Sequence, residues 1–369
     1  MGKQEQTEKI GIGPAYRWGA VIQFIAVVSL ALLLFVYLPS PEFFALKYGP
    51  WAMVMLVVLV HLSVQGGSWP FAPPDGGWAP GKSRLLSGIG MTTIWMILTF
   101  ALLFFMMYVY PKWPFGPLYV WFGTIAFWMT LFYGINWDTW PFKGKMHSWA
   151  TMIAGYAVIV TFSSLIWNFV NLAGTPFADS PYDPQGPVNV NWLSGFLLWG
   201  IAWFTVFSPA FTMQGWPFTK LGQPAMGIAQ TILAHVLGYV CWTSALAAGL
   251  SPTFASCAMA GSLVFAAYVH SWMFNLWGAT KFTGATRAFV ALALQIVLAG
   301  VWILVARFIL GPYAATVAGM NLPTDINVLT LLFTLDICLP VLIAHNSFWL
   351  RAPLTLPMPP GVPPSDQAE

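Results

Sequence analysis

The sequence predicts an all-helical protein that crosses a membrane about ten times. Hydrophobic residues make up 58% of the 369 residues and charged residues only 7%, whereas soluble domains carry about a quarter charged residues. Apolar runs of roughly 20 residues, the length that crosses about 30 Å of hydrocarbon, recur along the chain. These runs are apolar on every side and do not alternate, so we expect spanning helices and not a spanning barrel.

Ten apolar segments are predicted as spans of a single membrane domain, residues 18–350. They are 18–38, 50–67, 87–110, 116–136, 147–171, 191–213, 225–249, 253–276, 287–311 and 327–349. The polar stretch 1–17 is predicted as an N-terminal tail, and the Pro-rich stretch 351–369 as a C-terminal tail. The first apolar run lacks a small-residue cleavage pattern, so we expect it to remain as the first span.

The placement of basic residues predicts the orientation. Of the fourteen Lys and Arg residues, eleven fall on one side of the predicted spans and three, Lys47, Lys112 and Arg307, fall on the other. The positive-inside rule then puts both termini in the cytoplasm, and we expect a multi-pass protein of the cytoplasmic (inner) membrane. The net charge of +3 comes without a basic run, which argues against nucleic acid as a partner.

The tripeptide Trp-Pro-Phe recurs and indicates internal repeats. Spans two, four and six each end in it, at Trp69-Pro70-Phe71, Trp140-Pro141-Phe142 and Trp216-Pro217-Phe218. The end of span eight, His270 to Trp277, lines up with His61 to Trp69 when one residue is skipped. We therefore expect four or five repeated helical hairpins, the fifth completed by span one. A further copy, Trp113-Pro114-Phe115, falls on the opposite side and favours a simpler role for the tripeptide as an interface anchor.

Polar side chains gather near the same end of the even-numbered spans. The predicted substrate-binding set is His61, Gln65, Asn136, Asp138, Gln214, His270, Asn275, His345 and Asn346. Polar groups are costly in hydrocarbon and usually face a bundle interior or a wet cavity. The set therefore predicts a polar vestibule that opens to the cytoplasmic side. In the alternative interpretation, each side chain bonds a neighbouring helix or already lies among the lipid headgroups.

Two titratable residues are predicted deeper in the membrane. His235 falls deep in span seven, and Asp336 falls deep in span ten, four residues before Pro340. A carboxylate at that depth needs a partner or a proton, so Asp336 and His235 are predicted to couple transport to protons. In the alternative, a protonated Asp336 bonds a neighbouring helix.

The histidines also leave redox and metal chemistry open. Histidine pairs on different spans can hold b-type haem, and histidine with a carboxylate can hold a metal ion. No histidine pair has a metal-site spacing and the three cysteines form no Cys-x-x-Cys pair, so no metal ligand is assigned. The chain also has no Walker A loop, nucleophile elbow or dinucleotide fingerprint, which argues against ATPase, hydrolase and dinucleotide chemistry.

Together these features predict a transporter or permease, more than an enzyme, for a small neutral or weakly acidic organic solute. The scarcity of buried charge argues against strongly charged cargo, and Trp and Phe would supply an apolar wall. No resident cofactor is predicted. Two alternatives use the same residues: a membrane redox subunit that binds quinone or haem b, and a membrane-embedded metalloenzyme with histidine ligands. The expected partners are the lipid bilayer and the solute, and a homo-oligomer or a membrane-complex partner stays open.

Overall fold

The computed structural model describes residues 14–40, 43, 48–71, 84–104, 118–319 and 325–349. Most of both predicted tails, the loop after Phe71 and the Trp113-Pro114-Phe115 tripeptide lie outside these ranges. Several of the basic residues used to predict the orientation also lie outside them, namely Lys3, Lys9, Lys47, Lys82, Lys112 and Arg351.

Nearly all of the regular secondary structure in the described residues is helical, so the prediction of an all-helical class is confirmed. Wider π-type turns, labelled η, extend or interrupt many of the α-helices. The first half of the chain contains α1 (Pro14–Leu32), η2 (Leu33–Tyr37), α3 (Gly49–Val60), η4 (His61–Gln65), α4 (Arg84–Phe104), α5 (Leu118–Leu131), η6 (Phe132–Asn136) and α6 (Ser148–Trp167). The second half contains α7 (Val190–Phe207), α8 (Ala225–Ala247), η7 (Phe254–Ala260), α9 (Gly261–Tyr268), η8 (Val269–Met273), α10 (Gly284–Gly319), α11 (Ile326–Leu331), η9 (Leu332–Cys338) and α12 (Leu339–Ser347).

Seven helices within the described residues are long and apolar enough to cross a membrane. They are Leu85–Phe104, Ser148–Trp167, Val190–Phe207, Ala225–Ala247, Phe254–Met273, Gly284–Gly319 and Ile326–Ser347. Two shorter apolar helices, Trp18–Leu32 and Trp51–Gln65, accompany them. The longest, α10, has 36 residues with Pro312 in its interior, which corresponds to about 54 Å at about 1.5 Å per residue.

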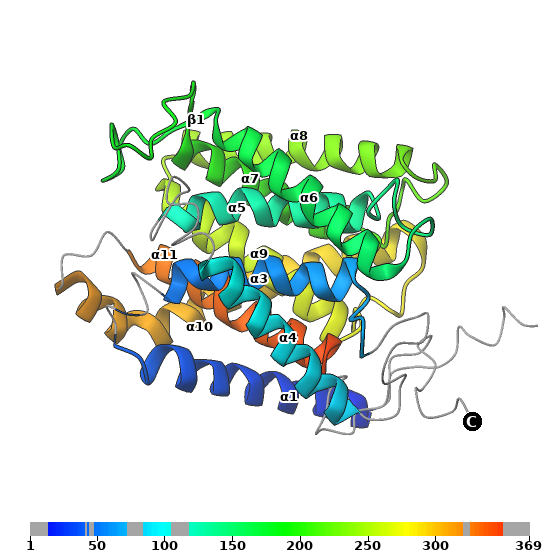
Figure 1. Ribbon diagram of the computed structural model, residues 1–369. Helices are drawn as coiled ribbons and strands as arrows, with labels where there is room; N and C mark the ends of the chain where they lie inside the picture. The colour runs from blue at the N-terminus through cyan, green and yellow to red at the C-terminus, as the bar shows by residue number, and fades with distance from the viewer. Residues whose placement is uncertain are drawn as a thin grey trace, which may run out of the picture.

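The helices lie side by side (Figure 1), and their contacts arrange them as an inner ring and an outer layer. Around the ring, α3 contacts α5, α5 contacts α7, α7 contacts α9, α9 contacts η9, and both η9 and α12 return to α3. On the outside, α4 packs on α3, α6 on α5, α8 on α7, α10 on α9 and α1 on α12. Burial separates the two layers: 67–83% of the long ring helices is buried, against 22–28% of α4, α6, α8 and α10. The outer helices are therefore the ones that present apolar surface to a surrounding lipid phase.

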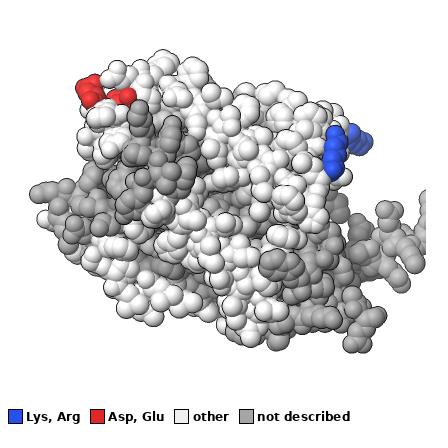
Figure 2. Space-filling view, viewed as in Figure 1, with Lys and Arg blue, Asp and Glu red and all other residues white. Residues whose placement is uncertain are grey.

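Exposed charged side chains are segregated on the face drawn in Figure 2. Acidic side chains gather at one end and basic side chains at the other, and the described residues visible between them are uncharged. A two-stranded parallel pairing, β1 (Val170–Asn171) with β2 (Val188–Asn189), closes a loop at the acidic end. An uncharged belt between two charged ends is the surface that a bilayer requires.

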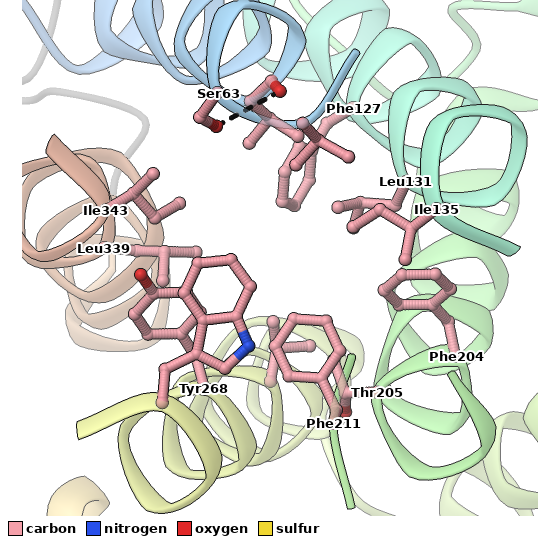
Figure 3. A pocket seen from close by; sticks show the side chains of 14 residues that line it. Ser63, Phe127, Leu131, Ile135, Phe204, Thr205, Phe211, Tyr268, Leu339 and Ile343 are labelled. Atoms are coloured by element: carbon pink, nitrogen blue, oxygen red, sulfur yellow. Dashed lines mark hydrogen bonds between the residues drawn. The ribbon is translucent and has the colours of Figure 1, made fainter. Parts of the chain in front are cut away.

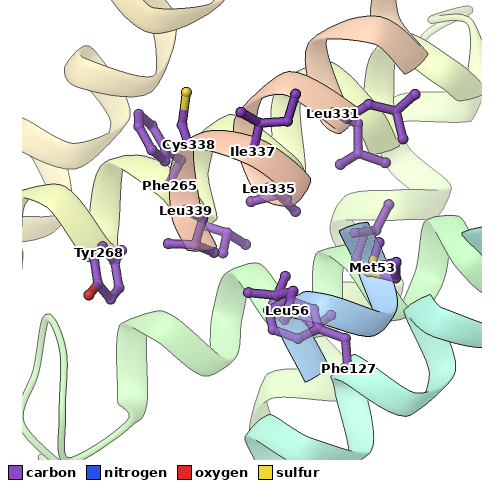
Figure 4. Packing of buried hydrophobic residues seen from close by; sticks show 14 of the residues in the cluster. Met53, Leu56, Phe127, Phe265, Tyr268, Leu331, Leu335, Ile337, Cys338 and Leu339 are labelled. Atoms are coloured by element: carbon purple, nitrogen blue, oxygen red, sulfur yellow. The ribbon is translucent and has the colours of Figure 1, made fainter. Parts of the chain in front are cut away.

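Packed apolar side chains fill part of the ring. Leu56 of α3 and Leu335 of η9 are completely buried, and Figure 4 shows them with neighbours from α5 and α9 that face one another across the ring. The Trp302 ring of α10 stacks on Phe333 at 5.8 Å between ring centroids. This packing fills the ring around the start of α3 and along η9.

A recurring turn follows three of the inner helices, and after η4 and η6 it leads into a Trp-Pro-Phe tripeptide. After η4, the Gly66 N–H donates to His61 O and the Ser68 N–H donates to Leu62 O, both at 3.0 Å. The same two bonds follow η6 and η8, from Trp137 to Phe132, Thr139 to Tyr133, Phe274 to Val269 and Leu276 to His270. Two residues of each turn adopt positive φ, as Gly67 and Ser68 do at 58° each. This conformation suits glycine but is uncommon for serine.

Candidate functional site

A cavity lies inside the ring of inner helices (Figure 3). Its empty volume is about 410 Å³. The lining residues are Val60, Ser63, Val64, Phe127, Leu131, Ile135, Phe204, Thr205, Phe211, Val264, Tyr268, Trp272, Leu339 and Ile343. They come from α3 and η4, α5 and η6, α7 and the loop after it, α9 and η8, and α12. All five predicted even-numbered spans therefore contribute to one shared space.

The cavity lies toward one end of these helices, because its lining residues fall near the C-terminal end of each one. Several of them are spaced four residues apart, as in Phe127, Leu131 and Ile135 or in Leu339 and Ile343. This spacing places side chains on a single helix face. It is the same end at which the sequence predicts the vestibule, but the walls are mostly apolar.

Most of the polar groups in the wall are already bonded within the protein. The Ser63 hydroxyl donates to Val60 O at 3.2 Å, and the Thr205 hydroxyl donates to Ala202 O at 2.7 Å. The Trp272 indole N–H donates to Ala210 O at 2.9 Å. The wall therefore favours an occupant that is largely apolar and carries no net charge.

His61 points away from this cavity. Its Nε2 lies 2.7 Å from Met152 O of α6, and its ring centroid lies 5.1 Å from that of Tyr156. A carbonyl oxygen only accepts, so Nε2 carries the proton and Nδ1 is an acceptor in the neutral ring. The Nδ1 atom is buried without a hydrogen-bond partner among the described residues.

Gln65 and Asn136 occupy buried helix contacts and are absent from the cavity wall. Gln65 is 7% exposed and Asn136 is fully buried. A Cβ atom on Gly134 would meet Gln65 Nε2 at 2.6 Å, so this glycine leaves room for the amide. Both side-chain amides lack hydrogen-bond partners in the part of the chain that the structure describes.

Asp138 and Asn275 belong to the recurring turns, and Gln214 lies in the turn that precedes Trp216. All three adopt positive φ, between 47° and 51°. Asp138 forms an ion pair with Lys143, and both side chains are about half exposed, at 48% and 57%. The turns follow the helix ends, so these three residues lie beyond the cavity and not in its wall.

His270 takes part in a buried network that joins three elements. Its Nε2 lies 2.9 Å from Trp277 O, and its Nδ1 lies 3.3 Å from Gln295 Nε2 of α10. Gln295 Oε1 in turn accepts from the Thr212 hydroxyl at 2.6 Å. Gln295 and Thr212 were not predicted as site residues, although a glutamine inside a long apolar helix was a usable signal.

The register of the turns also separates His270 from His61. In the shared bonding pattern, His61 corresponds to Val269, and His270 corresponds to Leu62. The two histidines are therefore one residue apart in the repeat. This offset accounts for the residue that has to be skipped to align the two sequences.

His235 of α8 is bonded at both ring nitrogens. Trp128 Nε1 donates to its Nε2 at 2.8 Å, and its Nδ1 lies 2.6 Å from Thr231 O. Its ring lies 4.7 Å from Phe132 and 5.6 Å from Phe196, centroid to centroid. His235 is thus held as a neutral ring within an aromatic contact between α5, α7 and α8.

His345 and Asn346 follow the lining residue Ile343 closely on α12, much as Gln65 and Asn136 directly follow the lining residues Val64 and Ile135. Both are partly buried. The Asn346 amide has no hydrogen-bond partner within the described ranges. These two residues therefore place polar groups near the end of α12 that adjoins the cavity.

Asp336 is buried in η9, in the wall of the inner ring. It is 1% exposed, and neither carboxyl oxygen has a hydrogen-bond partner in the described structure. Tyr48 and Cys257 lie within electrostatic range of its carboxyl group. An unpartnered carboxyl group in an apolar interior is held neutral by a proton.

A polar network lies where η7 and α11 begin, ahead of Asp336 along the chain. The Thr253 hydroxyl donates to Asp325 Oδ2 at 2.6 Å, and Arg307 donates to Asn327 Oδ1 at 2.5 Å. Cys257, one helical turn after Thr253, lies within electrostatic range of both Asp325 and Asp336. The network thus brings polar groups from one end of the ring toward the buried carboxyl group.

The described residues contain no group of three or more His, Cys, Asp or Glu side chains that could hold a metal ion. Comparison of the chain with protein-family models, with curated proteins and with solved structures finds no match. Function is therefore inferred from the geometry of the ring, its cavity and the buried polar side chains.

Proposed function

We propose that this protein is a permease of the cytoplasmic membrane for a small neutral or weakly acidic organic solute. In this proposal the chain crosses the membrane ten times as five hairpins, with both termini in the cytoplasm. Each hairpin pairs one inner helix with one outer helix, and α1 completes the last. The paired contacts of inner and outer helices and the recurring turn support this arrangement.

The cavity enclosed by the five inner helices carries the proposal. All five inner helices contribute to its wall, and none of its lining residues is charged. A weak acid would therefore enter as the neutral acid. His345 and Asn346 are proposed as the first polar contacts at the cytoplasmic end.

Apolar side chains fill the rest of the ring. The solute can therefore cross only if the protein adopts a second conformation in which this packing opens. Asp336 lies on an inner helix and is proposed to bind and release the coupled proton during that change. The Asp336 carboxyl group forms no ion pair in the described structure. In its uncharged form it would therefore not hold the inner helices in one conformation.

Uptake into proteoliposomes tests the cavity. We expect uptake of benzoic acid, increasing as the external pH falls, and loss of at least tenfold in rate when Ser63→Trp fills the cavity. Thr93→Trp, on an exposed position of α4, is the matched control and should transport normally. Equal uptake by the two variants would remove the cavity from the path.

Asp336→Asn tests the coupling. This variant keeps the size of the side chain and cannot release a proton. Downhill uptake should therefore persist, while any acceleration by a pH gradient beyond the rise in the neutral-acid fraction disappears. Dicyclohexylcarbodiimide, which modifies protonated carboxyl groups in apolar surroundings, should label the wild-type protein at Asp336 and leave the variant unlabelled there. Unchanged pH-driven uptake in Asp336→Asn would contradict the coupling role.

A further inference from the structure

A second cavity lies at the side of the ring, between α3, α4 and α6. Its empty volume is about 800 Å³. The lining residues are Val58, His61, Leu62, Leu98, Ala101, Leu102, Met152, Ile153 and Tyr156. A neighbouring cavity of about 430 Å³ shares Leu102 and Tyr156 with it and continues along α3 to Phe122 of α5. Together the two form an elongated space beside α3, which we call the side cavity.

The side cavity adjoins the lipid-facing surface. Two of its lining residues, Leu98 of α4 and Ile153 of α6, are 41% and 57% exposed. Both helices belong to the outer layer, whose apolar surfaces would contact lipid. A molecule dissolved in the bilayer can therefore enter from the side, without using the ring.

Two polar side chains of the side cavity, His61 and Tyr156, lie together, and the Ser163 hydroxyl lines the neighbouring part along α3. The Tyr156 hydroxyl makes no hydrogen bond within the described structure, and the adjacent His61 ring has an unpartnered acceptor at Nδ1. None of the nine lining residues is charged. A phosphate or ammonium headgroup would find no opposite charge here, so the chemistry favours a neutral head that can both donate and accept hydrogen bonds.

We propose that the side cavity binds a lipid-soluble molecule of the quinol class, with a neutral hydroxylated ring and an apolar tail. The ring lies beside His61 and Tyr156, where one hydroxyl donates to His61 Nδ1 and the Tyr156 hydroxyl donates to a ring oxygen. The tail follows the walls toward Phe122, which are apolar apart from Ser163. This site is separate from the proposed solute path, and it requires no transport to be tested.

Binding of decylubiquinol to the purified protein, measured by native mass spectrometry, tests the proposal. We expect one molecule per chain, and weaker binding of decylubiquinone, because the oxidised ring has no hydroxyl to donate to Nδ1. Ala101→Trp should reduce quinol binding at least tenfold by filling the side cavity. Ala157→Trp, at an exposed position of α6 outside the cavity, should bind as the wild-type protein does.

Tyr156→Phe provides a milder second test, because it removes only the hydroxyl. We expect quinol binding to weaken by about two- to tenfold, as for the loss of one hydrogen bond, while Tyr239→Phe at an exposed site on α8 has no effect. Wild-type affinity in both Ala101→Trp and Tyr156→Phe would overturn the proposal. Equal displacement of the quinol by phosphatidylcholine would also overturn it, since a charged headgroup would then fit.

Discussion

Two aspartates show how differently one side chain is used in the two parts of this molecule. Asp183, in the loop between β1 and β2, accepts backbone N–H groups of Gln185 at 2.9 Å and of Leu172 and Asp179 at 3.1 Å. Asp336, inside the ring, has no hydrogen-bond partner in the described structure. The Asp183 carboxylate stabilises the loop by accepting these backbone hydrogen bonds. The Asp336 carboxyl group makes no hydrogen bond that would stabilise the ring.

The electrostatics of the loop follow from its three donors. Partial burial of the Asp183 carboxylate opposes its ionisation, but the three N–H groups outweigh this and hold the pKa of Asp183 below its ordinary value. A carboxylate that organises backbone is a structural residue. A buried carboxyl group without partners is costly to keep, and that cost favours a role in the activity of the protein.

The largest effect is expected from charge placed inside the ring. Asp336→Arg introduces a permanent charge at the middle of a spanning helix, which costs roughly 3 kcal/mol or more, and we expect no folded protein by fluorescence-detected size exclusion. Asp183→Arg at the loop should still yield folded protein. A well-folded Asp336→Arg variant would show that the interior is wet and would break the comparison.

Removal of the loop carboxylate should have a smaller, local effect. Asp183→Ala leaves three backbone N–H groups without their acceptor, and we expect a loss of local stability of about 1 kcal/mol. Hydrogen exchange at Leu172, Asp179 and Gln185 should then become several-fold faster, with exchange in α7 unchanged. A uniform change across the molecule would instead indicate that the loop is coupled to the ring.

The same loop should respond to acid in a defined direction. Because the pKa of Asp183 is lowered in the folded loop, its stabilisation is fully present above about pH 4, the ordinary range for aspartate. It is lost as the pH falls through the lower folded value. Exchange protection of the loop, corrected for intrinsic rates, should be constant from pH 7 to pH 5 and should decrease below pH 4. Asp183→Asn should remove this dependence.

The smallest effect is expected at Asp138, a third aspartate that pairs with Lys143 at the surface. Both side chains are about half exposed, and exposed ion pairs contribute about 0–1 kcal/mol. Lys143→Ala should therefore leave the thermal unfolding temperature unchanged within about 1–2 °C. A larger decrease would show that the turn after η6 depends on this pair more than its exposure indicates.

Much of the helical layout could be predicted, because hydropathy alone marks a segment that lipid can surround. The predicted spans 147–171 and 327–349 differ by only a few residues from Ser148–Trp167 and Ile326–Ser347. The segment predicted at 287–311 was too short, since α10 continues to Gly319 through Pro312. A proline interrupts a helix less severely where neighbouring elements compensate for the lost backbone bond, and sequence alone does not show those neighbours.

The orientation of side chains was much harder to predict. His61 and Gln65 lie in a π-type turn, whose wider spacing changes the helix face that each residue occupies. A segment that is apolar on every side shows no periodicity from which this change of face could be predicted. The cavity wall offered a better signal, because Phe127, Leu131 and Ile135 recur at four-residue intervals. Tyr156 could not have been singled out, since its role depends on how α6 meets α3.

The length of α10 has a consequence for the membrane that surrounds the protein. A helix of 36 residues is far longer than the roughly 20 residues that cross an average hydrocarbon core. It has to lean steeply, or leave its last turns in the aqueous phase, and its fit varies with bilayer thickness. Lipids with longer or shorter acyl chains would then change the tilt of α10 relative to α9. The lipid composition of the membrane would in this way affect the packing of the inner ring.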